Sequence, residues 1–148
     1  MSRLLAIDYG KKRTGIAVSD PLQLIANGLT TVSTAGLFDF LHNYFQKEKV
    51  ERVIIGLPRQ MNYEASETLP EIERIADRLR KRYPEIEVIC YDERFTSKMA
   101  QQSMIEGGVK RKDRRNKALI DEISATIILQ GYMESRAYNE EKERRINL

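Results

Sequence analysis

The sequence predicts an α/β fold with a five-stranded mixed sheet, ordered 3-2-1-4-5 by position along the chain, and with helices on both faces. Residues 4–7 and 53–57 are almost wholly apolar and run into turn signals, which is typical of strands buried on both faces of a sheet. The short turn at 10–13 makes the first two strands antiparallel neighbours. Helical periodicity before the fourth and the fifth strand predicts right-handed crossovers between parallel strands.

The boundaries follow from local signals along the chain. Asp20-Pro21 ends the second strand, because proline cannot donate a hydrogen bond to a neighbouring strand. Ser66 is the expected N-cap of the second helix, which Pro84 stops. The expected elements are strands at 3–8, 14–19 and 29–32, a helix at 36–49, a strand at 52–57, a helix at 66–83, a strand at 87–91, a short helix at about 97–105 and a last helix at about 117–138.

Composition and length indicate one soluble globular domain that spans residues 1–148. Of the 148 residues 41% are hydrophobic and 32% are charged, which differs from a disordered composition. No apolar stretch approaches the ~20 residues of a membrane span. Cys90 has no second cysteine to pair with, so a reducing cytoplasm is the expected location. One cysteine and one histidine cannot fill a structural zinc site.

The basic residues are concentrated in one part of the chain. Between residues 94 and 117, eight basic residues stand against two acidic ones, a local excess of six positive charges. Such a patch is typical of a surface that binds a polyanion such as nucleic acid, although a solvated charged loop is the alternative interpretation. The basic residues are Arg94, Lys98, Lys110, Arg111, Lys112, Arg114, Arg115 and Lys117.

Acidic residues follow two of the predicted parallel strands. Asp8 ends the first strand and Asp92-Glu93 end the fifth, so these carboxylates are expected at the same edge of the sheet. The turn residues Lys11, Lys12 and Arg13 open on that edge as well. Spacing alone does not choose between Asp92 and Glu93, because neighbouring strand residues face opposite ways. Asp20, after an antiparallel strand, is expected at the opposite rim as a turn residue.

A third acid comes from the last helix. Counting by three and four from Asp121 gives mostly apolar residues, which places Asp121 on the apolar stripe near the helix start. An acid that only compensates the helix dipole is the alternative interpretation. Glu122 is expected to face solvent. The residues of the stripe are Ala118, Ala125, Ile128 and Tyr132.

Three carboxylates at one rim repel one another unless a cation joins them. Mg²⁺ is held by one or two carboxylates together with substrate phosphates, and a pair of such ions can activate water for phosphodiester cleavage. A basic rim would hold the nucleic-acid backbone, by shape rather than by base sequence. The carboxylates and the basic patch together predict a metal-dependent nuclease. A nucleic-acid-binding module without catalytic activity is the main alternative.

Five stretches of the chain resemble the YqgF/RuvX family. They are Ile7-Asp8-Tyr9-Gly10, the segment 13–20, Gly56-Leu57-Pro58, Asp92-Glu93-Arg94-Phe95-Thr96-Ser97 and Asp121-Glu122-Ile123-Ser124-Ala125. The resemblance implies an RNase H-like fold in a cytoplasmic bacterial hydrolase that acts on ester bonds. Its members are described as Holliday-junction resolvases or as nucleases that mature the 5′ end of pre-16S ribosomal RNA. The implied substrate is therefore an rRNA precursor or branched DNA.

The resemblance also implies the roles of individual residues. The family's acids fall on Asp8, Glu93 and Asp121, which are the expected catalytic residues and ligands of Mg²⁺ or Mn²⁺. Asp8 would bridge the metals and the other two would flank them. The protein would be a monomer or a homodimer. The expected nucleic-acid contacts are Lys11, Lys12, Arg13, Arg94, Lys110, Arg111, Lys112, Arg114 and Arg115.

Two features depart from the related proteins. The loop after Gly56-Leu57-Pro58 contains the interruption Tyr63-Glu64-Ala65, which bears on substrate preference. The fourth strand ends without an acid, where resolvases of this fold commonly carry their second one.

Asp-x-Gly after a first strand also opens the actin and sugar-kinase ATPases. These ATPases need two such domains around the nucleotide, and 148 residues supply only one.

Overall fold

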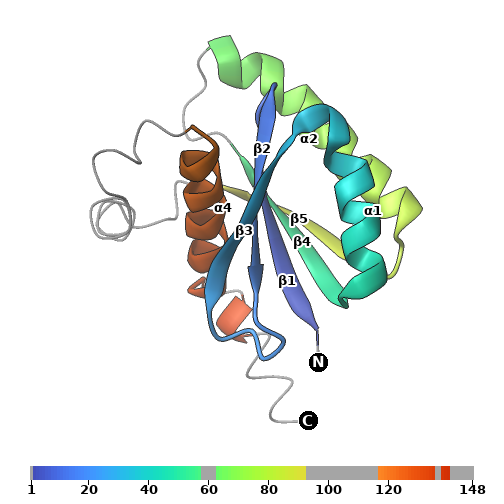
Figure 1. The fold of residues 1–148 in the computed structure, drawn as a ribbon, viewed down its shortest axis with the longest axis vertical. Helices are drawn as coiled ribbons and strands as arrows, with labels where there is room; N and C mark the ends of the chain where they lie inside the picture. The colour runs from blue at the N-terminus through green and yellow to red at the C-terminus, as the bar shows by residue number, and fades with distance from the viewer. Residues whose placement is uncertain (1, 58–62, 93–116, 136–137, 141–148) are drawn as a thin grey trace.

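The computed structural model describes residues 2–57, 63–92, 117–135 and 138–140 (Figure 1). Its sheet has five strands in the order β3-β2-β1-β4-β5, which confirms the predicted topology. The strands are β1 (Arg3–Asp8), β2 (Arg13–Ser19), β3 (Ala26–Ser33), β4 (Val50–Leu57) and β5 (Glu87–Asp92), and the helices are α1 (Leu37–Lys47) after a 3-10 turn (Thr34–Gly36), α2 (Tyr63–Arg82) and α4 (Lys117–Met133).

The directions of the strands decide which side chains meet at one edge. β1 is antiparallel to β2 and parallel to β4, and β4 is parallel to β5. The carboxyl ends of β1, β4 and β5 therefore lie together, next to the turn that leads into β2. The mixed sheet thus presents the end of β1, Asp8, at the edge where α/β proteins bind ligands.

Two hydrophobic cores cover the two faces of the sheet. Leu5 and Ile7 of β1 pack with α1 and α2, whereas Leu4 and Ala6 pack with α4. Figure 1 shows α4 on one side of the sheet and α1 with α2 on the other. This alternation explains why residues 4–7 in the middle of β1 are all apolar, because both faces of this strand are buried. The face covered by α4 is called the α4 face below.

Some predicted boundaries were wrong. α2 begins at Tyr63, so Ser66 lies inside the helix and is not its N-cap. Glu64 and Ala65 are good helix formers and extend the helix toward its amino end. α4 ends at Met133 rather than at Tyr138, where the N–H of Ser135 donates to the carbonyl of Tyr132 and closes a turn. The predicted short helix at about 97–105 lies outside the described residues.

None of the helices in the described ranges is long and apolar enough to cross a membrane.

Candidate active site

Asp8 ends the central strand on the α4 face. Leu4 and Ala6 belong to the core beneath α4, and the two-residue period of a strand puts Asp8 on the same face. Its antiparallel neighbour is Gly15. On the other side Ile7 pairs with Ile55, so continuing the register places Gly56 next to Asp8. Neither neighbouring strand therefore contributes a side chain next to this carboxylate.

The first turns of α4 rest on β2 at the residue that pairs with Asp8. A Cβ atom on Gly15 would lie only 2.0 Å from the backbone oxygen of Asp121. Real Cβ atoms do not approach a backbone atom so closely, so this contact requires glycine. The structure thus brings Asp121 to the same edge and the same face as Asp8, although 113 residues separate them along the chain.

Asp121 lies on the buried stripe of α4, as the periodicity predicted. Ala125 and Ile128 are buried on the sheet, whereas Ile120 is 41% exposed. The first turn of α4 contains no acidic residue, so dipole compensation does not explain Asp121. Its carboxylate instead accepts a hydrogen bond from Arg13, with 3.0 Å between Nε and Oδ2. The partner of Asp121 among the described residues is therefore the guanidinium of a predicted nucleic-acid contact.

The turn between β1 and β2 is held tightly from the side of β3. A Cβ on Gly10 would lie 2.5 Å from the carbonyl oxygen of Arg13, so this turn also requires glycine. The hydroxyl of Thr34 donates to the carbonyl of Gly10 at 2.5 Å, and the N–H of Thr34 donates to the carbonyl of Lys12 at 3.0 Å. These bonds fix the backbone that carries the basic side chains.

Two acids of α2 hold the same turn from its other side. The phenol of Tyr9 donates to Glu71 Oε2 at 2.5 Å, and Lys11 forms an ion pair with Glu67. Burial, and next the hydrogen bond to Glu71, raises the pKa of Tyr9 from 10.0 to about 12. Neither acid was predicted from the sequence. Their spacing of four residues, which places them on one face of a helix, was the available signal.

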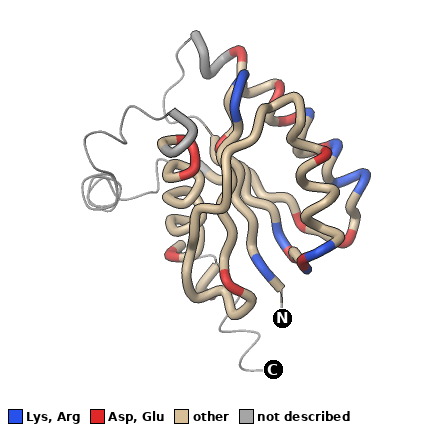
Figure 2. Tube along the Cα trace, in the orientation of Figure 1, with Lys and Arg blue, Asp and Glu red and all other residues tan. Residues whose placement is uncertain are grey.

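The three basic residues of the turn differ in their surroundings. Lys11 and Arg13 each pair with a carboxylate, whereas Lys12 is exposed and makes no ion pair within the described part of the chain. Figure 2 shows this basic turn at the same end of the molecule as the acidic segment of α4. Lys12 is therefore the member of the turn whose charge is available to a phosphate.

Asp20 and Glu122 are two further acids whose positions were predicted from the sequence. Asp20 lies in the β2–β3 connection, where its carboxylate accepts the N–H groups of Leu24 at 2.7 Å and Ile25 at 2.8 Å. These bonds hold the pKa of Asp20 below its ordinary value, and its predicted role as a turn residue is confirmed. Glu122 is half-buried, and its Oε1 lies 2.6 Å from where a Cβ on Gly28 would be. The prediction that it faces solvent was wrong, because α4 also covers β3.

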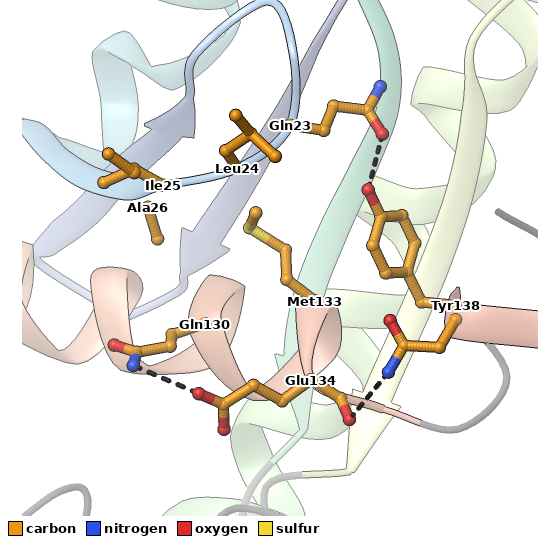
Figure 3. Close-up of a pocket in the computed structure, with 9 residues that line it drawn as sticks. Gln23, Leu24, Ile25, Ala26, Gln130, Met133, Glu134 and Tyr138 are labelled. Carbon is orange, nitrogen blue, oxygen red and sulfur yellow. Dashed lines mark hydrogen bonds between the residues drawn. The ribbon is translucent and has the colours of Figure 1, made fainter.

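A separate hollow lies at the opposite end of the sheet (Figure 3). It has a volume of about 390 Å³ and lies between the β2–β3 connection and the end of α4. Tyr138 donates to Gln23 Oε1 across it at 2.8 Å. Its lining contains none of the predicted site residues, so its size does not make it the catalytic site.

The donor groups at the carboxyl edge fit a hard divalent cation. Within the described ranges, no cluster of three or more His, Cys, Asp or Glu side chains could hold a metal ion. Asp8, which pairs with Gly15, and Asp121, whose backbone packs on Gly15, provide two carboxylates at this edge, and Mg²⁺ in proteins commonly uses one or two carboxylates with waters and phosphates. The other predicted residues lie outside the described residues: Glu93, Arg94, Lys110, Arg111, Lys112, Arg114 and Arg115.

A family model described as "RuvX: Holliday junction resolvase" matches residues 2–135. The chain belongs to the RuvX family. A relative from Bacteroides thetaiotaomicron, named "Putative pre-16S rRNA nuclease", is 64% identical over 93% of this chain and 100% of its own length. A Porphyromonas gingivalis relative with the same name is 54% identical over 91% of this chain and 98% of its own.

Solved structures confirm the RNase H-like fold class. The structure titled "T. thermophilus RuvC in complex with Holliday junction substrate" superposes with a TM-score of 0.57 at 16% identity, over 88% of this chain and 92% of that one. RuvC has an RNase H-like fold, so the architecture expected from the sequence is correct. At this identity the similarity shows the fold alone.

Proposed function

We propose that the chain is a metal-dependent nuclease that hydrolyses phosphodiester bonds in structured nucleic acid. The observation that carries this proposal is that Asp8 pairs with Gly15 and that the backbone of Asp121 packs on the same glycine, at the ligand-binding edge of an RNase H-like sheet. The names of the curated relatives favour the 5′ end of pre-16S rRNA as the substrate, with a four-way DNA junction as the second candidate. We also propose that the protein is cytoplasmic and that it is a monomer or a homodimer.

The proposed ligands are Asp8, Asp121 and Glu93. The choice of Glu93 over Asp92 is the one that the family resemblance implied. Glu93 itself lies outside the described residues.

Asp8, Asp121 and Lys12 would have different roles in the proposed reaction. These carboxylates would hold a divalent cation, which would supply a lowered pKa for water and stabilisation of charge on the leaving oxygen. Asp8 and Asp121 would orient this cation, and Lys12 would contact a phosphate of the substrate. Cys90 is not a candidate nucleophile, because it packs on the face of α1 and α2 and burial raises the pKa of its thiol.

An Asp8→Asn variant tests the proposal. We expect it to abolish cleavage with Mg²⁺ or Mn²⁺ while leaving the thermal unfolding and nucleic-acid binding unchanged, because asparagine keeps the shape and removes the charge. Asp20→Asn is the matched control, since Asp20 lies at the opposite rim and should not affect cleavage. Both variants and the wild type would be assayed side by side on precursor rRNA and on a four-way DNA junction.

The outcomes separate the two candidate functions. Equal cleavage by wild type and Asp8→Asn would refute the assignment of Asp8. Tight binding by the wild type without cleavage at any Mg²⁺ or Mn²⁺ concentration would instead identify a nucleic-acid-binding module. Faster cleavage of the precursor RNA than of the junction would establish the ribosomal substrate.

A further inference from the structure

We propose that Arg13 is a positioning residue that serves as the internal counter-ion of Asp121 and that a divalent cation displaces it. The guanidinium would then be released toward the phosphates of the substrate. This inference rests on the proposed function, because it takes Asp121 as a metal ligand. It makes the loading of metal and the binding of substrate depend on each other through one side chain.

The contact joins segments far apart in the chain at the edge of the sheet where Asp8 ends β1. Arg13 begins β2 and, with Gly15, lies on the α4 face by the alternation that places Ala17 in the core beneath α4. Its Nε lies 3.0 Å from Asp121 Oδ2, and 108 residues separate the two partners. The next residue of β2 on this face after Arg13 is Gly15, which pairs with Asp8. The guanidinium is therefore positive charge at the carboxylate of Asp121, which a metal ion bound by both aspartates would also contact.

The exposure of the pair makes it exchangeable. The Arg13 side chain is 41% exposed and that of Asp121 is 26% exposed. Ion pairs in contact with solvent are weak, and a divalent cation carries twice the charge of a guanidinium. A cation on Asp121 would also repel Arg13, because both are positive. The two cations therefore compete for one carboxylate.

The released guanidinium has a suitable new partner in the substrate. Asp121 is the carboxylate that pairs with Arg13 among the described residues, and the neighbouring Lys12 offers only positive charge. Guanidinium groups bind phosphate and carboxylate oxygens with similar geometry. A nucleic-acid backbone at this edge would therefore replace the contact that Arg13 loses when the metal binds.

Calorimetric titration of the full-length chain with Mn²⁺ tests the competition. We expect Arg13→Gln to bind Mn²⁺ roughly two- to fivefold more tightly than wild type, the change that corresponds to removing an exposed ion pair. Lys12→Gln is the matched control, because it removes the same charge from the same turn, and Lys12 makes no ion pair with the residues that the structure describes. Arg13→Lys keeps a competing cation and should restore an affinity close to that of wild type. In an Asp121→Asn background, Arg13→Gln should bring no tightening beyond that of Lys12→Gln.

A measurement on the wild type covers the case in which Arg13→Gln fails to fold. The Nε–H group of Arg13 is observable by ¹⁵N NMR, and Mg²⁺ should accelerate its hydrogen exchange by releasing it from Asp121. Unchanged exchange on saturation with Mg²⁺, or Mn²⁺ binding by Arg13→Gln no tighter than that of Lys12→Gln, would overturn the inference. Mn²⁺ binding that neither Asp8→Asn nor Asp121→Asn weakens would overturn the proposed function and this inference with it.

Discussion

Replacing Gly15 with alanine should displace the start of α4 and with it Asp121. The new Cβ would lie 2.0 Å from the backbone oxygen of Asp121 and 2.4 Å from its carbonyl carbon. Backbone atoms cannot rotate away, so the helix itself must shift against a core in which Ala125 and Leu129 are fully buried. Overpacking of this kind costs about 1–3 kcal/mol, and we expect the upper part of that range, about 2–3 kcal/mol.

Gly28→Ala is the matched control on the neighbouring strand. The three atoms nearest its Cβ all belong to the side chain of Glu122, with Oε1 at 2.6 Å and Cγ at 2.7 Å, so this flexible side chain rather than the helix backbone must move. We therefore expect its unfolding free energy to stay within about 0.5 kcal/mol of wild type, since alanine in a strand is otherwise preferred to glycine.

Urea unfolding followed by circular dichroism measures both variants. Slopes in urea are about 1–3 kcal/mol/M, so Gly15→Ala should lower the midpoint by roughly 1–2 M. Cleavage at a temperature where the variant is folded should fall about 10²-fold, because a catalytic group displaced by about 1 Å has effects of this size. A midpoint within measurement error of the wild type, or an equal loss in Gly28→Ala, would refute the close contact between α4 and β2.

Two further predictions concern the basic turn. Lys12→Gln should reduce the slope of log affinity against log salt for nucleic acid by about 0.7–0.9, which corresponds to one phosphate contact. Lys11→Gln should change this slope less, because Glu67 already pairs with Lys11. Equal slopes in the two variants would contradict this prediction. Tyr9→Phe should lower stability at pH 7 by about 1 kcal/mol through loss of the bond to Glu71. Because the pKa of Tyr9 is raised from 10.0 to about 12 in the folded protein, its contribution is fully present below pH 10 and is lost as the pH rises to about 12. The stability difference between Tyr9→Phe and wild type should therefore shrink over that interval, and a constant difference in chemical unfolding would count against the Glu71 contact.

The topology could be predicted because its causes are local. The apolar runs of β1 and β4 and the length of the turn before β2 are properties of short segments, and they decide which strands are buried and which are antiparallel. The edge on which Asp8 opens follows from strand direction alone. Boundaries were less predictable, as at Ser66, because neighbouring helix formers compete with a good capping residue.

The candidate site could be predicted only in its residue types. Helical periodicity placed Asp121 on the buried stripe, but it does not state how wide a face the sheet covers, and so Glu122 was misplaced. The acids of α2 that hold Tyr9 and Lys11 were missed for a related reason. Periodicity shows which residues share a helix face, whereas the position of that helix over the turn depends on packing.

The sequence by itself thus determined the order of the strands, the two-sided core and the placement of Asp8 at a ligand-binding edge, since these depend on periodicity and turn length. Only the tertiary structure decided that Asp121 rests on Gly15 and that Arg13 occupies its carboxylate. The physical reason is that α4 has no fixed axis until its buried stripe packs on the sheet, and Gly15 sets how closely the helix can approach β2. A contact between residues 13 and 121 is a product of that packing and leaves no local pattern in the chain.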